Sequence, residues 1–314
     1  MARFVGGRLV EAIPVLLLSS LLVFAILHLV PGDPVDAMMG AASFGISTPE
    51  SQAKLVAQIR EQLGLNDPHP LQYLHWLGNA LRLDFGESFI RHQSVSSLIA
   101  QRLPTTLELA GAALLLSVIV GMAMGIVAAL KRNTPIDGLV MIFSLGGVSM
   151  PSFAFAMVLI LVFSVFLGLL PATGSGSLDR LILPTLALGY EGTGLIATLT
   201  RASLLEVLGR EYMTTARAKG LPRRIVILRH ALRNALIPVV TIVGLQVGRL
   251  LAGSIIVETV FARQGVGQLA IDAIQTKDYP LVQGIILLTA SGYVLANLLV
   301  DISYGFINPK IRTA

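Results

Sequence analysis

The chain has 314 residues, of which 54% are hydrophobic and only 13% are charged. A soluble domain carries about a quarter charged residues, so this composition indicates an integral membrane protein and excludes an ordinary soluble domain. The formal net charge of +5 then needs no nucleic-acid partner, and the lack of cysteine excludes a disulfide framework, a thiolate metal site and a cysteine nucleophile.

The N-terminal segment, residues 1–30, is expected to form the first transmembrane helix. Arg3 and Arg8 precede an apolar run that is long enough to cross a bilayer of roughly 30 Å. The run is longer than a signal-peptide core, and no small-residue cleavage site follows it, so we expect the span to be retained.

Residues 31–98 form a long polar segment, expected outside the cytoplasm, with two amphipathic stretches. The first begins at Thr48-Pro49, an N-cap followed by proline, and ends at Gly64. The apolar residues of the two stretches are Leu55, Ile59 and Leu63, and then Leu71, Leu74, Leu77 and Leu81 with Tyr73 and Trp76. The segment either lies at the level of the lipid headgroups or forms a small cap packed on its own apolar side.

A membrane core is expected over residues 99–304, followed by a cytoplasmic tail at 305–314. Its five spans are expected at about 105–130, 139–170, 181–199, 236–257 and 281–300. The span at 139–170 is too long for one perpendicular crossing, so it is either one tilted helix, kinked near Gly146-Gly147 and Pro151, or two spans. A single broken span is favoured, because two spans would place the basic loop 200–234 outside the cell.

The distribution of Lys and Arg predicts six spans with both termini in the cytoplasm. The segments expected inside carry Arg3, Arg8, Lys131, Arg132, Arg201, Arg210, Arg217, Lys219, Arg223, Arg224, Arg229, Arg233, Lys310 and Arg312. Short loops decide this rule, so the long 31–98 segment has little weight in it.

The stretch 201–238 is the longest strongly polar interruption in the second half of the chain. We expect a helix that runs to about Lys219, is capped by Gly220 and is stopped by Pro222. Five residues in it share a small side chain: Thr214, Thr215, Ala216, Ala218 and Gly220. Such a face lets another backbone approach closely, which indicates a cytoplasmic docking surface. The alternative is a basic loop that only fixes orientation.

Two charged residues are expected near the middle of the membrane, Glu191 and Arg249. Exposing either to lipid would cost about 3 kcal/mol or more, so both must face protein or water. Arg249 and Gln246 are three residues apart on one helix and are expected to line a polar path, with Glu191 as a partner for Arg249. Alternatively, the pair is buried and only locks the bundle. Ser149, Met150 and Pro151 could open the third helix towards the same cavity, although kinking alone also explains the proline.

Signatures of catalysis and of an internal energy source are missing from the sequence. No P-loop occurs, so the chain is not expected to bind ATP, and neither a G-x-S-x-G elbow nor an H-E-x-x-H motif appears. His69 and His75 have no third ligand at a recognisable spacing, so no metal site is expected. A proton relay of buried carboxylates is also lacking. We therefore expect a non-enzymatic chain that takes energy from another subunit.

The segments 211–221 and 229–238 resemble the coupling loop of ABC importer permeases, in particular the peptide/nickel (dipeptide and oligopeptide) branch. The resemblance extends over nearly the whole chain. Its other fragments, in family order, are His28–Pro34, Leu83–Gly86, Arg102–Leu109, Ser149–Phe153, Lys277–Pro280, Asn297–Asp301 and Asn308–Arg312.

The resemblance implies a type I permease fold, all-α with six transmembrane helices and cytoplasmic coupling helices, in a bacterial inner membrane. It implies a second similar permease subunit, two cytoplasmic ATPase subunits that bind ATP and magnesium, and an extracytoplasmic binding protein. The residues implied in contact with the ATPase are Glu211, Tyr212, Thr214, Thr215, Ala216, Ala218, Gly220 and Leu221.

The chain departs from the family pattern at two places. Thr214-Thr215-Ala216 stands where the general importer motif has Glu-Ala-Ala, and Arg263-Gln264-Gly265 stands where this branch commonly has Trp-Pro-Gly. The solute implied by the resemblance is a short peptide. A nickel chelate, glutathione or an opine-like compound is the alternative within the family, and a non-transporting scaffold or receptor is the alternative of a different class.

Overall fold

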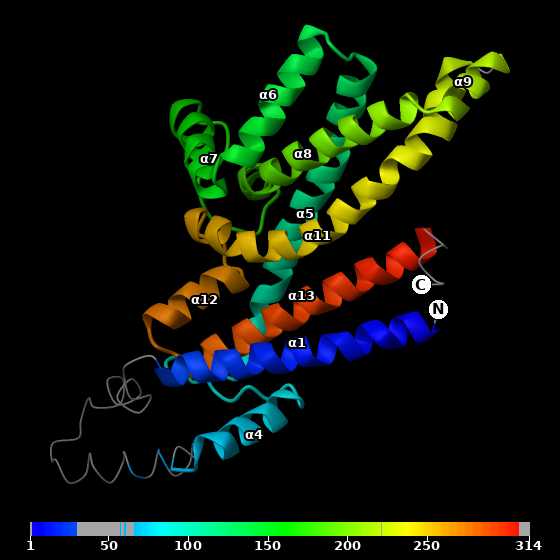
Figure 1. The fold of residues 1–314 in the computed structure, drawn as a ribbon. Coiled ribbons are helices and arrows are strands. Elements are labelled where there is room, and N and C mark those ends of the chain that lie inside the picture. Colours follow the sequence, from blue (N-terminus) through cyan, green and yellow to red (C-terminus); the bar gives the residue numbers. More distant parts are fainter. Residues whose placement is uncertain (1, 30–56, 58–59, 61–65, 221, 308–314) are drawn as a thin grey trace. The chain divides into compact units, whose positions relative to one another are not determined.

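The computed structural model describes residues 2–29, 57, 60, 66–220 and 222–307, and their regular structure is helical (Figure 1). One isolated antiparallel bridge joins Glu87 and Ser94. The described residues belong to two compact units: unit 1 comprises 1–5, 105–264 and 295–314, and unit 2 comprises 6–104 and 265–294. The expected stripe of Leu55, Ile59 and Leu63, like residues 308–314 of the expected tail, lies outside the described residues.

Within the described part of the chain, four helical stretches are long and apolar enough to cross a membrane: 95–130, 179–208, 223–260 and 279–298. A bent pair of helices within 135–166 makes a fifth if it is one span. Helix α1 (Ala2–Leu29) adds a shorter apolar stretch, Val10–Ala25. These elements occupy the positions of the six expected spans, and they make the chain a multi-pass membrane protein.

Unit 1 is organised around helix α8 (Asp179–Leu208), which packs against three other helices. These are α6 (Pro135–Ser149), α7 (Ser152–Leu159) and α11 (Leu232–Val260). Buried apolar residues of α8, including Leu183, Ala187 and Leu188, form one core with residues of the neighbouring helices. Because much of α8 is buried, a polar side chain on its exposed strip is a candidate functional residue.

Glycines let α8 approach helix α5 (Val95–Leu130) within unit 1. A Cβ atom at Gly121 would lie 2.8 Å from the Thr193 carbonyl oxygen, and one at Gly125 would lie 2.5 Å from the Ala197 carbonyl oxygen. Contact of this kind is typical of membrane helices, where small residues bring backbones together because lipid provides no hydrophobic drive.

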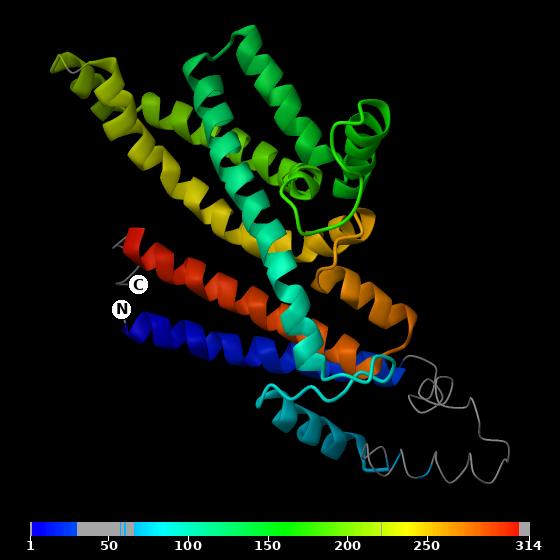
Figure 2. The same cartoon turned by 180° about the vertical axis from the view of Figure 1, so that it is seen from behind.

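The third expected span is broken at Met150-Pro151, where α6 and α7 meet at an angle of 112° (Figures 1 and 2). Helix α7 continues into a π-helical turn, η1 (Ile160–Phe166). The proline therefore breaks the helix as expected, but the bend is much sharper than a kink. Gly146 and Gly147 have a different role: a Cβ at Gly147 would lie 2.7 Å from the carbonyl oxygen of Tyr190 on α8.

Unit 2 contains most of α1, α4 (His69–Ala80), the first turns of α5, α12 (Val266–Gln275) and the first part of α13 (Tyr279–Ile307). Its core joins residues far apart in sequence, such as Val95 and Leu98 with Leu269 and Leu281.

Helix α4 packs against α1 through its aromatic residues and not through its leucines. Tyr73 hydrogen-bonds to Ser20 of α1 over 2.8 Å, and the rings of Tyr73 and Trp76 lie 5.5 and 6.2 Å from that of Phe24. Leu71, Leu74 and Leu81 are exposed. These leucines are therefore not the packed side of a small cap, and their exposure fits the headgroup-level alternative.

Candidate coupling segment and intramembrane charge pair

The polar stretch 201–238 contains several helical segments, and the helix expected to run to about Lys219 is interrupted. Helix α8 ends at Leu208, Gly209 follows, and α9 runs over Glu211–Ala218. The expected stop is present, because Gly220 adopts a φ of +74° and Pro222 precedes α10 (Arg223–Ile225). A π-helical turn, η2 (Val226–Ala231), then leads into α11.

Helix α9 has a buried side and an exposed side. Met213 and Ala216 are buried in a small core with Leu204 of α8 and Val226 of η2. Of the residues implied in contact with the ATPase, the exposed ones are Glu211, Tyr212, Thr214, Thr215, Ala218 and Gly220; Lys219 is exposed beside them. Ala216 therefore packs against the core beneath α9 and is not on the surface that a partner could contact. Leu221 lies outside the described residues.

Three of the exposed residues of α9, Thr214, Thr215 and Ala218, have small side chains. Tyr212 is held in place, since the Asn234 side-chain amide of α11 donates to its hydroxyl over 3.2 Å. The Arg210 side chain pairs with Glu206 one turn earlier on α8. The N-terminal end of α9 is therefore anchored while Thr214, Thr215 and Ala218 remain accessible.

Arg201 is a structural residue that the sequence analysis counted only as a basic loop residue. Its guanidinium donates two hydrogen bonds to Asp137 of α6, of 2.6 and 2.8 Å. Asp137 also accepts the backbone N–H of Asn133. The signal in the sequence was a lone carboxylate just after the Lys131-Arg132 turn, on the same expected membrane side as Arg201.

The two mid-helix charges are brought together. Arg249 Nη1 lies 3.7 Å from Glu191 Oε1, so the expected partnership is observed. The side chains are 64% and 53% exposed, respectively, which disagrees with a pair buried inside the bundle of this subunit. Each lies about 17 Å along its helix from the joined ends of α8 and α11, where Arg263 contacts Arg180.

Gln246 does not share the exposed position of Arg249. Its side chain is buried, and it packs against Gly192 of α8. The residues at the α6–α7 bend differ again: Ser149 and Pro151 are exposed and Met150 is partly exposed. Gln246 is therefore the buried member of the six residues expected on a path, and it supports the charge pair from within the helix bundle.

Tyr190 is a residue that the sequence analysis missed. Its hydroxyl donates to the Phe143 carbonyl of α6 over 3.0 Å, and its ring lies 4.9 Å from that of Phe143 and 4.3 Å from that of Phe155 of α7. Tyr190 therefore packs inside the bend between α6 and α7, and Glu191 of the charge pair is the next residue on α8.

Arg263 is also more important than expected. The side chain is 1% exposed, and its guanidinium donates to Glu108 over 3.0 Å and to the Arg180 carbonyl over 3.2 Å. Glu108, whose side chain is 50% exposed, thus joins α5 to the buried Arg263 just after the end of α11. Arg263 fills the place where the branch commonly has tryptophan.

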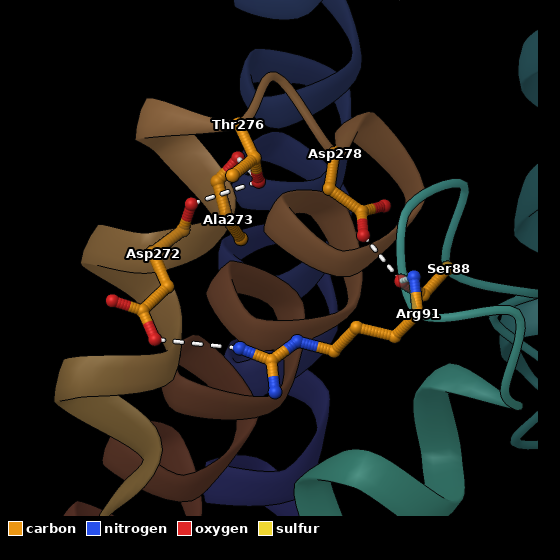
Figure 3. A network of polar contacts seen from close by, with 6 residues as sticks. All are labelled: Ser88, Arg91, Asp272, Ala273, Thr276 and Asp278. Carbon is orange, nitrogen blue, oxygen red and sulfur yellow. Dashed lines mark hydrogen bonds and ion pairs between the residues drawn. The ribbon is translucent and has the colours of Figure 1, made fainter. Parts of the chain in front are cut away.

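In unit 2, a polar network fastens the loop 84–94 to the turn before α13 (Figure 3). The buried Asp278 carboxylate accepts the Ser88 hydroxyl and the Phe89 backbone N–H. Arg91 donates to Asp272 over 3.3 Å on the exposed side of the same loop. The fragment Lys277–Pro280 therefore contributes Asp278 to a structural clasp with the loop 84–94.

A metal site is not formed by the part of the chain that the structure describes, where no three His, Cys, Asp or Glu residues cluster suitably. His75 has only a loose, exposed contact with Asp67 at 3.9 Å.

Long apolar helices, the polar segment around α9 and the lack of strands among the described residues fit the class that the comparisons show, the ABC importer permeases. Residues 121–313 match the family described as binding-protein-dependent transport system inner membrane component, and residues 1–110 match its N-terminal domain. The chain belongs to this family. It is a permease subunit of an ABC importer, in which ATP hydrolysis resides in separate subunits, and not a scaffold or receptor outside transport.

Among curated relatives, the glutathione transport system permease protein GsiC of Escherichia coli strain K12 is 45% identical over 312 residues, covering 99% of each chain. The protein of that name from Salmonella typhimurium is 44% identical over the same length. The peptide/nickel-type branch is thereby confirmed.

Solved structures agree on the fold. The inward-facing MetNI methionine ABC transporter matches 67% of this chain and 96% of its own with a TM-score of 0.57 and 18% identity. An amino acid ABC transporter with histidines matches 68% and 94% with a TM-score of 0.53. The type I permease fold predicted from the sequence is therefore confirmed.

Proposed function

We propose that this subunit conducts short peptides, including glutathione-like compounds, across the bacterial inner membrane. The observation that carries this proposal is the 45% identity, over 99% of both chains, to a permease named for glutathione transport. Glutathione is itself a small peptide-like zwitterion, so the peptide and glutathione alternatives differ only in detail. Nickel chelates and opine-like compounds remain competing solutes.

The proposed assembly has this chain beside a second, similar permease subunit, with two cytoplasmic ATPase subunits and an extracytoplasmic binding protein. ATP and Mg²⁺ bind the ATPase subunits, and this chain uses no cofactor of its own. Both termini and the 200–234 loop lie in the cytoplasm. Support for this orientation comes from the basic residues of the short loops.

The exposed side of α9 is proposed to dock in a cleft of an ATPase subunit. Thr214, Thr215 and Ala218 are exposed, and Met213 and Ala216 fasten the helix to α8 and η2. Small side chains permit close contact, and the buried side transmits the movement of the docked helix to α8. The solute path is proposed to pass the Arg249–Glu191 pair and the bend at Ser149, Met150 and Pro151, with Gln246 behind the pair.

Uptake measurements test the solute. A strain that lacks its own peptide and glutathione importers should take up labelled glutathione and dialanine when it expresses the complete importer, and should lose both when this chain is omitted. Uptake of a nickel chelate alone would contradict the proposal.

A bulky substitution on the exposed side of α9 should stop transport without disturbing the fold. We expect Thr215→Trp to reduce uptake at least tenfold, because the indole prevents close docking. Gly220→Trp should do the same, although the φ of +74° at this position adds backbone strain. The matched control is Arg132→Trp, an exposed position in the turn between α5 and α6. Normal uptake by a correctly inserted Thr215→Trp variant would contradict docking through α9.

A further inference from the structure

Two of the arginine–carboxylate pairs in unit 1, Arg201–Asp137 and Arg249–Glu191, differ in geometry. Arg201 and Asp137 form two hydrogen bonds, and their side chains are 25% and 6% exposed. Arg249 and Glu191 approach only to 3.7 Å, and both are more than half exposed. In the first pair the guanidinium and the carboxylate hydrogen-bond to each other, and we call it the closed pair. In the second they form no hydrogen bond, and we call it the open pair.

The open pair keeps most of its hydrogen-bonding capacity. A guanidinium has five N–H donors and a carboxylate has two acceptor oxygens, and 3.7 Å is too long for a hydrogen bond between them. Within the described part of the chain, neither side chain makes a hydrogen bond. Because the pair lies on apolar membrane helices, these groups need a polar partner other than the described residues of this chain.

The backbone behind the pair is fixed by buried polar contacts. The side chains of Gln246 and Ser117 come so close to Gly192 that a Cβ there would clash with both. The Ser117 hydroxyl donates to the Gly189 carbonyl over 2.8 Å, and the Thr193 hydroxyl donates to the same carbonyl. Helices α5, α8 and α11 therefore meet next to Glu191, so the two exposed charges project from a rigid support.

We propose that Arg249 and Glu191 form a subsite for a zwitterionic solute. Arg249 binds a carboxylate of the solute and Glu191 binds its ammonium group, so that the loose ion pair is exchanged for two pairs with the solute during passage. The proposal rests on the proposed function and adds the chemistry by which the path accepts its solute.

The pairing of two opposite charges is what selects a zwitterion. An anion alone would satisfy Arg249 and leave Glu191 without its counter-ion, and a cation alone would do the reverse. A solute with both groups compensates both side chains at once and leaves the net charge of the site unchanged. Free peptides and the γ-glutamyl end of glutathione both have this chemistry.

The test is uptake of labelled glutathione and dialanine by proteoliposomes that contain the complete importer, ATP and saturating binding protein. Arg249→Met and Glu191→Gln are each expected to lower the maximal rate at least tenfold. The half-saturating concentration of loaded binding protein should change less than twofold, because docking of that protein is elsewhere. Arg249→Lys keeps the cation and should recover part of the rate.

The double variant Arg249→Met/Glu191→Gln decides between recognition and a structural role. If both groups bind solute, the double variant is at least as slow as either single variant. A structural pair predicts the opposite, because the double variant leaves no unpaired charge and should outperform both singles. Since it lacks an unpaired charge, the double variant also serves if a single variant fails to assemble.

Faster uptake by the double variant, or unchanged rates in all variants, would overturn the subsite while leaving the importer function intact. Failure of the unmutated importer to take up either probe would overturn the proposed solute class, and the subsite with it.

Discussion

Gly147 lies directly beneath the backbone of Tyr190, and this contact allows α6 to pack on α8. A methyl group there would lie 2.7 Å from a carbonyl oxygen, closer than a carbon and an oxygen normally approach. By contrast, Gly138 on the same helix has open space around it. Two glycines in one helix thus have different importance, which the sequence does not reveal.

Gly147→Ala should therefore destabilise the protein by about 1–3 kcal/mol, because the added methyl group overpacks the α6–α8 contact. Gly138→Ala is the matched control, and it should be neutral or slightly stabilising because alanine favours helix. Thermal unfolding of the detergent-purified protein measures both. Equal stability of the two variants would contradict the proposed tight packing.

Asp278 is the buried anchor of the clasp in unit 2 (Figure 3). Asp278→Ala leaves the Ser88 hydroxyl and the Phe89 N–H without their acceptor, at about 1–3 kcal/mol for each stranded group. Asp272→Ala removes only the exposed pair with Arg91, which is worth about 0–1 kcal/mol. Unfolding temperatures and protease cleavage in the loop 84–94 should separate the two variants clearly. A larger effect of Asp272→Ala would show that the ranking by burial is wrong.

At the scale of elements, helix positions were readable from the sequence because apolar runs of membrane length have few alternatives. Proline and glycine also marked the stop after α9 and the break at Pro151. The 112° bend was not predicted, since its angle depends on Tyr190, which packs between α6 and α7 from another helix. The break at Gly209 was missed for a similar reason: α9 turns so that Met213 and Ala216 reach a core that only the folded chain creates.

The bend between α6 and α7 can be tested by substituting Tyr190, the residue that packs inside it. Tyr190→Phe removes only the hydrogen bond to the Phe143 carbonyl, whereas Tyr190→Ala also empties the space between Phe143 and Phe155. We expect about 1 kcal/mol of destabilisation from the first change and about 3–5 kcal/mol from the second. Thermal unfolding and uptake should both follow this order. Tyr190→Ala with the stability of the unmutated protein would exclude Tyr190 as the residue that supports the bend.

Charged partners were predicted unevenly for a physical reason. Glu191 and Arg249 stood out because charge in an apolar span is costly, and the cost itself demands a partner. Asp137, Glu108 and Arg263 lie near helix ends, where solvated charges are common, so their positions in the sequence did not require a buried or paired partner. Their pairing depends on which helix ends come together, and this is set by packing in unit 1.

At the scale of the whole molecule, the chain provides a membrane passage but depends on an external motor. Its family places ATP hydrolysis in separate subunits. The exposed side of α9 is the proposed point where the motor acts, and the Arg249–Glu191 pair is the proposed point where the solute is met. Both lie in unit 1: α9 follows the C-terminal end of α8, and the charge pair joins the middle of α8 to the middle of α11, so one pair of helices connects coupling to passage.

Site-directed cross-linking at α9 tests this account most directly, and the lack of cysteine in the chain makes Thr215→Cys a single-cysteine subunit. In the assembled importer, we predict that a short bismaleimide links this cysteine to an ATPase subunit, and that a membrane-impermeant thiol reagent added outside intact cells does not reach it. An assembled complex in which Thr215→Cys is labelled from outside, or links to no ATPase subunit, would contradict the account.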